Sequence, residues 1–226
     1  MNDATTGATR ADGVGDSRRE HMLRCAMDVI AERGFADTRI ADVAERAGSS
    51  PALVIYYFQT KDNLLTEAVR LAEHLWYDFV YRSMDAVTGA RGRLEAIVHT
   101  SFHPAADLGF PDLASLWVEL WARSLRHTEV ARMREAFDAQ WRQVIAGVVL
   151  EGQATGEFAP VDAAEFATAL SALLDGLSVQ LTLGDPAVDP AVAIRIAMGF
   201  AAGRLGFAWA PDDVGAAPVA GPLARA

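Results

Sequence analysis

Two pairs of residues at helical spacing are the first side chains in this sequence that could do chemistry. His99 and His103 lie four residues apart, as metal-binding histidines on one helix face do, and Asp107 is the nearest further ligand. Cys25 follows His21 by four residues, but no third group orients this pair as a nucleophile and its base would require. Because neither pair forms a complete site, we expect no metal, no cofactor and no catalytic residue. The protein is predicted not to be an enzyme.

A second group of side chains combines aromatic rings with carboxylates. Trp117 and Trp121 lie one helical turn apart with Glu119 between them, and Asp175 lies within another apolar stretch. Carboxylates beside aromatic faces suit a cationic or quaternary ammonium ligand, whereas the rings alone would suit an uncharged aromatic or aliphatic one. The alternative is that the rings form core and the carboxylates are exposed or cap helices. The candidate ligand-binding residues are Trp76, Phe79, Phe102, Trp117, Glu119, Trp121, Phe137, Trp141 and Asp175.

Helices must position these side chains, because apolar residues recur at helical spacing through most of the chain. There is little strand-like alternation and no hairpin signature. The fold is therefore predicted to be all-α with about nine helices. We expect them at residues 17–33, 40–47, 51–57, from Thr60 onward, 90–103, 112–126, 129–154, 163–183 and 190–207.

A tight turn separates the second and third of these helices. Gly48 ends one helix, Ser50 is a natural N-cap, and Pro51 suits the first position of the next helix. The third helix is only about two turns long, so it must lean on its neighbours while its N-terminal end projects. This arrangement is typical of a helix-turn-helix unit, whose second helix enters the major groove of DNA.

The same region resembles a known family of regulators. Its motifs, in order, are Gly34-Phe35, Ile40-Ala41-Asp42-Val43-Ala44, Ala47-Gly48 and Tyr57-Phe58-Gln59-Thr60-Lys61-Asp62-Asn63-Leu64-Leu65. Over about residues 18–66 they are similar to the DNA-binding domain of TetR-type transcriptional repressors. Two later motifs resemble the C-terminal domain of the subgroup that includes the choline-responsive regulator BetI. They are Trp117-Val118-Glu119-Leu120-Trp121 and Leu174-Asp175-Gly176-Leu177.

The resemblance implies a set of DNA contacts. Ser50, Pro51, Ala52 and Val54 would face base edges; Tyr56, Tyr57, Thr60 and Lys61 would hold phosphates; Thr38 and Arg39 would meet the backbone or a groove. Two positions depart from the family pattern. Arg39 stands where Ser or Thr usually caps the helix, which adds a cation at some cost to the cap. Ile55 stands where tyrosine is common, so no contact is carried over to that position.

The charge of the chain qualifies this prediction. The net charge of -10 argues by itself against nucleic acid, because binding to phosphates needs cations. Residues 1–61, however, carry eight basic and nine acidic side chains, whereas residues 62–226 carry twelve and twenty-one. The acidic excess therefore belongs to the larger C-terminal part. Lys61 is the single lysine among 20 basic residues, and its compact ammonium group suits a phosphate contact.

Four segments are expected: a disordered arm at 1–16, the DNA-binding domain at 17–66, a ligand-binding and dimerisation domain at 67–208, and a flexible tail at 209–226. The leucines of the helix at 163–183 and the apolar residues at 190–207 predict a broad apolar face and a symmetric homodimer. A single cysteine, no signal-peptide pattern and no long uncharged apolar run predict a cytoplasmic protein without a membrane span.

The sequence thus predicts a homodimeric regulator, most simply a repressor, that leaves a palindromic double-stranded DNA operator when a small molecule binds its C-terminal domain. The effector would be cationic or aromatic. One alternative is a helix-turn-helix regulator without a small-molecule ligand. A second alternative is an all-helical enzyme that binds a small cation and has no role on DNA.

Overall fold

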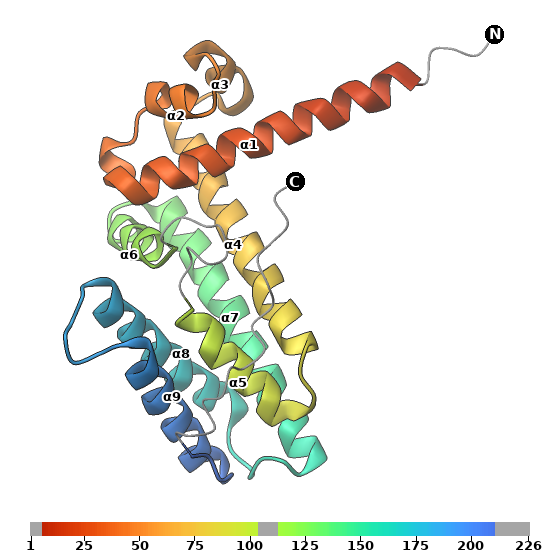
Figure 1. Cartoon of the computed structure of the whole chain (residues 1–226), viewed down its shortest axis with the longest axis vertical. Coiled ribbons are helices and arrows are strands. Elements are labelled where there is room, and N and C mark those ends of the chain that lie inside the picture. Colours follow the sequence, from red (N-terminus) through yellow and green to blue (C-terminus); the bar gives the residue numbers. More distant parts are fainter. Residues whose placement is uncertain (1–5, 104–112, 211–226) are drawn as a thin grey trace. The chain divides into compact units, whose positions relative to one another are not determined.

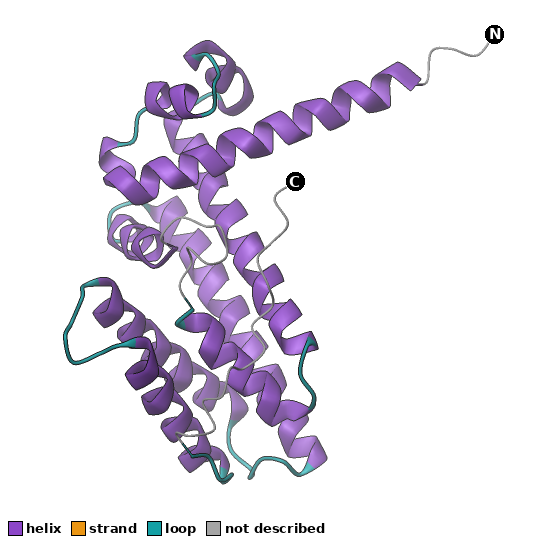
Figure 2. Cartoon of the chain, in the orientation of Figure 1, coloured by secondary structure: helices purple, strands orange, loops and turns teal. Residues whose placement is uncertain are grey.

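The computed structural model describes residues 6–103 and 113–210, and these residues form nine helices and no strand (Figures 1 and 2). The helices are α1 (Thr6–Asp37), α2 (Ile40–Arg46), α3 (Pro51–Phe58), α4 (Lys61–Asp85), α5 (Gly89–Ser101), α6 (Leu113–Ser124), α7 (Thr128–Thr155), α8 (Ala163–Thr182) and α9 (Pro190–Leu205). The all-α prediction is confirmed. The chain divides into two compact units, Met1–His74 and Leu75–Ala226, so their boundary lies within α4 and later than residue 66.

The two predicted end segments each include residues that the structure describes. The backbone of α1 is helical from Thr6, inside the predicted arm, because extending a helix that already exists requires no new nucleus. At the other end, Trp209 packs against the core of the second unit, so the predicted flexible tail does not begin there. Residues 1–5 and 211–226 lie outside the described residues.

The first unit is built around the two short helices α2 and α3. Neither is long enough to be stable alone; α2 packs against α1 and α3, and both short helices bury their inner faces. The side chains that form this core are fully buried: Met22, Ala26, Met27, Ile30, Val43, Ala44, Val54, Phe58, Leu64, Leu65 and Ala68. The core therefore fixes how the turn between α2 and α3 is presented.

In the second unit, the long helix α7 packs against α5, α6 and α8, and α9 packs on α8. Aspartates cap the starts of α8 and α9. The carboxylate of Asp162 accepts hydrogen bonds from the backbone N–H groups of Ala164 and Glu165, both at 2.9 Å, and that of Asp189 accepts one from Val192 at 2.7 Å. These caps set where α8 and α9 begin.

The predicted apolar face on α8 and α9 is mostly used within the chain itself. Leu170, Leu174 and Leu177 of α8 are buried in the core of the second unit, as are Ile194 and Met198 of α9. The periodicity identified an apolar face, but its partner is the same chain, because α5 and α7 cover it. A dimer surface on these two helices would therefore use their other side.

Candidate DNA-reading surface and effector site

The turn before α3 presents this helix for DNA reading. The N–H of Ser49 donates to the carbonyl of Ala44 at 2.8 Å, and the Oγ of Ser50 accepts from the N–H of Leu53 at 3.2 Å. Val54 and Phe58 are 0% and 1% exposed and anchor the inner face of the helix. The opposite face is left to solvent, as a recognition helix requires.

Two of the residues predicted to contact DNA, Val54 and Thr38, are buried inside the first unit. Val54 has no exposed surface, because the short α3 needs it as an anchor, so it cannot meet base edges. Thr38 is also fully buried, and its hydroxyl donates to the carbonyl of Gly34 at 2.7 Å. Gly34 has φ 75° and ψ 168°, which interrupts the helical geometry of α1. Thr38 therefore holds this break in place.

The remaining predicted contacts are accessible. Ser50, Pro51 and Ala52 are exposed at the start of α3, in the position predicted for base contacts. Tyr56 is 76% exposed, and its ring meets the half-buried Tyr57 edge-on at 5.4 Å between centroids. Tyr57 therefore supports Tyr56 as well as offering its own hydroxyl.

Thr60 and Lys61 each have a structural partner. The hydroxyl oxygen of Thr60 accepts from the N–H of Asn63 at 3.1 Å and thereby caps α4. The Nζ of Lys61 donates to the carbonyl of Ala36 at 2.9 Å. Both side chains remain at the surface, Thr60 exposed and Lys61 half-buried. The cap by Thr60 agrees with its position at the start of α4, whereas the contact of Lys61 with Ala36 was not predicted.

Arg39 is the N-cap residue of α2, and its side chain is exposed. The capping role that the sequence expected from a Ser or Thr is met differently. The carboxylate of Asp42 reaches back and accepts from the N–H of Arg39 at 3.2 Å, and the same carboxylate pairs with Arg33 at 3.0 Å. The Arg39 guanidinium is thus not needed for the cap, and a phosphate contact from this residue stays a prediction.

Several arginines of this unit are held by internal ion pairs. Arg46 donates to both carboxylate oxygens of Glu32, at 2.7 and 2.6 Å, which joins α2 to α1. Arg19 pairs with Glu67 and lies over the ring of Phe58 at 5.2 Å, which joins α1 to α4 and to the anchor of α3. These pairs stabilise the unit and reduce the cationic charge that faces a ligand.

Aromatic side chains gather in the second unit between α4 and α7. The indoles of Trp76 and Trp141 lie 4.6 Å apart between centroids. Tyr77, which is not among the predicted ligand residues, lies 6.4 Å from Trp141 between ring centroids and donates its hydroxyl to the carbonyl of Phe137 at 3.4 Å. Tyr81 stacks on Tyr77 at 6.0 Å and extends the group along α4. We call Trp76, Tyr77, Tyr81 and Trp141 the aromatic cluster.

Two carboxylates lie on the helices that carry or adjoin this cluster. Asp138 is one helical turn before Trp141 on α7, and Asp175 is half-buried on α8, which packs against α7. Burial raises the pKa of Asp175 to about 6, and the carboxylate of Asp138 adds to this rise while Arg142 opposes it. The pKa of Asp138 is also raised by burial, against the pull of Arg134 and Arg142. Asp138 is paired with Arg134, and a half-buried carboxylate such as Asp175 favours a nearby cation.

The other predicted ligand residues are dispersed. Phe79 and Phe102 are buried core, and Glu119 is exposed on α6, so these three lie outside the cluster. Trp117 packs edge-on against Phe137 at 5.8 Å, and Trp121 is half-buried on the same helix. The nine predicted ligand-binding residues therefore do not form one group. Trp76 contacts Trp141, and Trp117 contacts Phe137.

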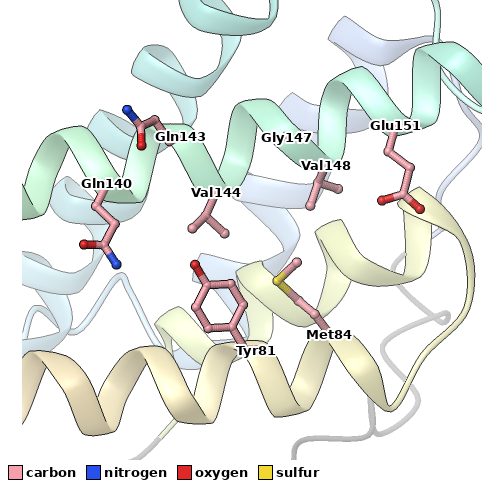
Figure 3. Close-up of a pocket in the computed structure, with 8 residues that line it drawn as sticks. All are labelled: Tyr81, Met84, Gln140, Gln143, Val144, Gly147, Val148 and Glu151. Atoms are coloured by element: carbon pink, nitrogen blue, oxygen red, sulfur yellow. The ribbon is translucent and has the colours of Figure 1, made fainter.

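An open groove of about 300 Å³ lies next to the cluster, between α4 and α7 (Figure 3). Its lining residues are Tyr81, Met84, Gln140, Gln143, Val144, Gly147, Val148 and Glu151. None of the nine predicted ligand residues lines it. Tyr81 belongs to both the groove and the aromatic cluster, so the two features are continuous along α4.

The side chains of His103 and Cys25 contact neighbouring side chains. His103 lies against the ring of Phe79 at 5.9 Å, and burial lowers the pKa of His99. Within residues 6–103 and 113–210, no three His, Cys, Asp or Glu side chains are grouped to hold a metal. Asp107 lies outside the described residues. Cys25 is buried, which raises its pKa, and its Sγ lies 3.8 Å from His21.

These features define a class of protein: a helix-turn-helix reading unit combined with a second helical unit that carries a candidate effector site. Comparison with known proteins gives the family. A model described as bacterial regulatory proteins, tetR family, matches residues 22–68, and one described as BetI-type transcriptional repressor, C-terminal, matches residues 90–206. The chain therefore belongs to the TetR family and is a DNA-binding transcriptional regulator.

Individual relatives agree with this assignment. The regulator BetI of Agrobacterium fabrum is 31% identical over 172 residues, which cover 76% of this chain and 80% of that protein. BetI of Stenotrophomonas maltophilia is 35% identical over 127 residues, or 56% of this chain and 64% of that protein. These relatives are named as transcriptional regulators, a class that is generally not enzymatic.

Solved structures show the same fold. A putative transcriptional regulator from Saccharomonospora viridis, determined in complex with choline, is 31% identical with a TM-score of 0.73 and covers 82% of this chain and 95% of that one. A putative TetR-family regulator from Rhodococcus sp. is 25% identical with a TM-score of 0.72, and the match covers 84% of this chain and 99% of that one.

Among the described residues of this chain, no helix is long and apolar enough to cross a membrane.

Proposed function

We propose that this protein is a homodimeric repressor that leaves a palindromic operator when a small organic cation of the quaternary ammonium type binds its second unit. The observation that carries the effector class is the aromatic cluster on α4 and α7 with two desolvated carboxylates, Asp138 and Asp175, on α7 and α8. Aromatic faces attract an alkylated ammonium, and the half-buried carboxylate of Asp175 supplies negative charge that water screens only in part, whereas the carboxylate of Asp138 is paired with Arg134. The choline held by the Saccharomonospora viridis protein supports this class.

The proposed dimer uses the outer face of α8 and α9. On α9, Ile196 is 41% exposed, and Gly199 and Gly203 beside it have open space where a Cβ would stand. On α8, Gly176 is exposed and equally open. Small residues let two helix pairs approach closely, and an exposed isoleucine supplies apolar area. A dimer places two α3 helices for two half-sites about one helical turn of DNA apart.

The test is footprinting of the DNA that flanks the gene of this protein, repeated with choline. We expect a protected palindrome that choline releases. The matched control compound is 3,3-dimethylbutan-1-ol, which has the shape of choline without its charge and should leave the footprint intact. Release by both compounds would reject the cationic effector class. Release by neither would favour a regulator without this ligand.

Two variants connect the release to the proposed site. Trp141→Leu should weaken choline binding, because it removes an aromatic face and keeps an apolar side chain, and Trp121→Leu is the matched control on α6.

The dimer is tested separately by light scattering, where Ile196→Asp should shift the protein toward monomer. A wild-type protein that is monomeric at micromolar concentration, on and off DNA, would contradict the dimer proposal.

A further inference from the structure

The exposed face of α3 is almost entirely apolar. Its exposed side chains are Pro51, Ala52, Ile55 and Tyr56, with Ile55 at 48% and Tyr56 at 76% exposure. The hydroxyl of Tyr56 is the single polar side-chain group among these four. No arginine, lysine, asparagine or glutamine lies within α3.

This composition limits what α3 can read in a major groove. Guanine is recognised chiefly by the forked donors of arginine or by lysine, and adenine by the amide of asparagine or glutamine. Thymine is different, because its C5-methyl group is an apolar feature at the groove surface that apolar side chains contact. An apolar recognition helix therefore matches thymine methyl groups better than it matches any hydrogen-bonding base edge.

Ile55 is held so that it can make such a contact. Pro51 and Ala52 precede it by four and three residues, so the three side chains share one face of the helix. Val54 and Phe58 are buried and prevent α3 from rotating this face away. A β-branched side chain in a helix also has one strongly preferred χ1 rotamer, so Ile55 loses little side-chain entropy on contact.

The polar residues around α3 are placed outside this face. Ser50 precedes the helix, and its oxygen is engaged by the N–H of Leu53. Gln59 follows the helix with φ 63°, beyond the last turn. Arg46 on α2 is held by both oxygens of Glu32. Arg39 is exposed, and it is the N-cap residue of α2 rather than part of α3.

We propose that Ile55, together with Pro51 and Ala52, reads the C5-methyl groups of thymines by van der Waals contact, so that the bases beneath α3 in each half-site are thymines. This inference rests on the proposed DNA-binding function, and it specifies which bases α3 contacts. Ile55, which departs from the tyrosine common in the family, becomes a specificity-determining residue of this chain.

The experiment begins with selection of binding sites from a randomised DNA duplex by the full-length wild-type protein. In the enriched half-site, each thymine is then replaced by deoxyuridine, which lacks the methyl group and keeps the same base pairing. We expect at least one replacement per half-site to weaken wild-type binding about fourfold, the equivalent of burying one methyl or methylene group. The deoxyuridine replacement changes only the DNA, so its result does not depend on whether a protein variant folds.

A double-mutant cycle assigns the contact. Ile55→Ala should lose the penalty at the sensitive thymine, whereas Ile55→Val should retain most of it, and the matched control Tyr56→Phe should retain it fully. Far-ultraviolet circular dichroism and melting temperature confirm that each variant is folded. An enriched half-site in which every uracil is neutral, or in which the penalty persists in Ile55→Ala, overturns the proposal and leaves DNA binding intact. No enriched sequence at all would overturn the DNA-binding function itself.

Discussion

The ammonium group of Lys61 lies 2.9 Å from the carbonyl oxygen of Ala36, so the first residue of α4 is tied to the end of α1. Ala36 follows the break at Gly34, where the helical geometry of α1 is interrupted. An ammonium has three donors, and one of them satisfies this carbonyl. The same side chain can therefore fix the loop before α2 and still donate to a DNA phosphate.

Replacing Lys61 by alanine should weaken binding to every duplex, whatever its sequence. Loss of one phosphate contact should reduce the slope of log affinity against log salt concentration by about 0.9. Fluorescence anisotropy between about 50 and 200 mM salt, with specific and random duplexes, measures both effects. Lys61→Arg keeps the charge and should keep the slope. A Lys61→Ala slope equal to the wild-type slope would leave the lysine with its structural role only.

Gly152 in α7 should not tolerate alanine. A Cβ at this position would lie 2.1 Å from a ring carbon of Phe158, which is 4% exposed and packed against Phe207. We expect Gly152→Ala to reduce the free energy of unfolding by about 1–3 kcal/mol, as overpacking of a core does. The measurement is urea unfolding followed by circular dichroism.

Gly147 supplies the matched control on the same helix. It lies at the open groove, and a Cβ there meets nothing within 4 Å (Figure 3). Gly147→Ala should therefore raise the free energy of unfolding by about 0.5–1 kcal/mol, because alanine loses less conformational entropy in a helix than glycine does. Equal effects of the two substitutions would show that Phe158 moves aside readily.

Glu73 on α4 should make the protein less stable as the pH rises. Burial raises its pKa to about 7, against the influence of Arg70, and its Oε1 is buried without a hydrogen-bond partner. Because this pKa lies above the unfolded value, the folded state holds more protons between about pH 4.5 and 7. Stability therefore falls as the pH rises through this window.

The variant Glu73→Gln should remove part of this fall. Thermal unfolding from pH 5 to pH 8 should show similar melting temperatures for the two proteins at pH 5, where Glu73 is protonated when folded, and a more stable variant at pH 8. Asp138 and Asp175 have raised pKa values too, so some decline should remain. Parallel curves for variant and wild type would reject the assignment.

Binding of choline to the proposed effector site should depend on the ionisation of Asp175. Its pKa of about 6 means that the carboxyl is half protonated near pH 6, and a cation binds the ionised form better. Affinity should therefore rise as the pH increases from 5 to 7, with Asp138 and Arg142 the charged neighbours that modulate it. Quenching of tryptophan fluorescence by choline provides the measurement.

Asp175→Asn separates this effect from general changes in the protein. The variant keeps the size of the side chain and removes its titration, so choline binding should be weaker and its dependence on pH near 6 should be largely lost. An unchanged pH profile in Asp175→Asn would assign the dependence to another group. Binding of 3,3-dimethylbutan-1-ol should show no such dependence in either protein.

The helix pattern was predictable because its signals are local. Ser50 caps the helix that it was expected to start, and apolar spacing identified every helix of the described residues. The sequence was less informative about which face of each helix packs inside the protein and which face is left for binding. Val54 was assigned to DNA by its position in the motif, whereas the two-turn helix requires it as an anchor. The length of a helix decides how many of its residues are available for binding.

The candidate effector site was predicted in part for a related reason. Trp76 and Trp141 were recognised as aromatic residues in apolar helices, and they do meet at 4.6 Å. Tyr77 and Tyr81 were missed, although a tyrosine that follows Trp76 directly and another one turn later were visible signals. Glu119 was included because it lies between two tryptophans, but residues i and i+2 on a helix point in different directions, and Glu119 is exposed.

The ion pairs that hold Arg19, Arg33 and Arg46 also bear on how this regulator finds its site in a genome. Non-specific affinity for DNA comes from cations that displace counterions, and here carboxylates of the protein itself already engage these arginines. Residence on random DNA should therefore be brief, and long one-dimensional sliding should be rare. The search should proceed mainly by repeated dissociation and collision, so the time needed to occupy the specific site should depend strongly on the number of copies of the protein in the cell.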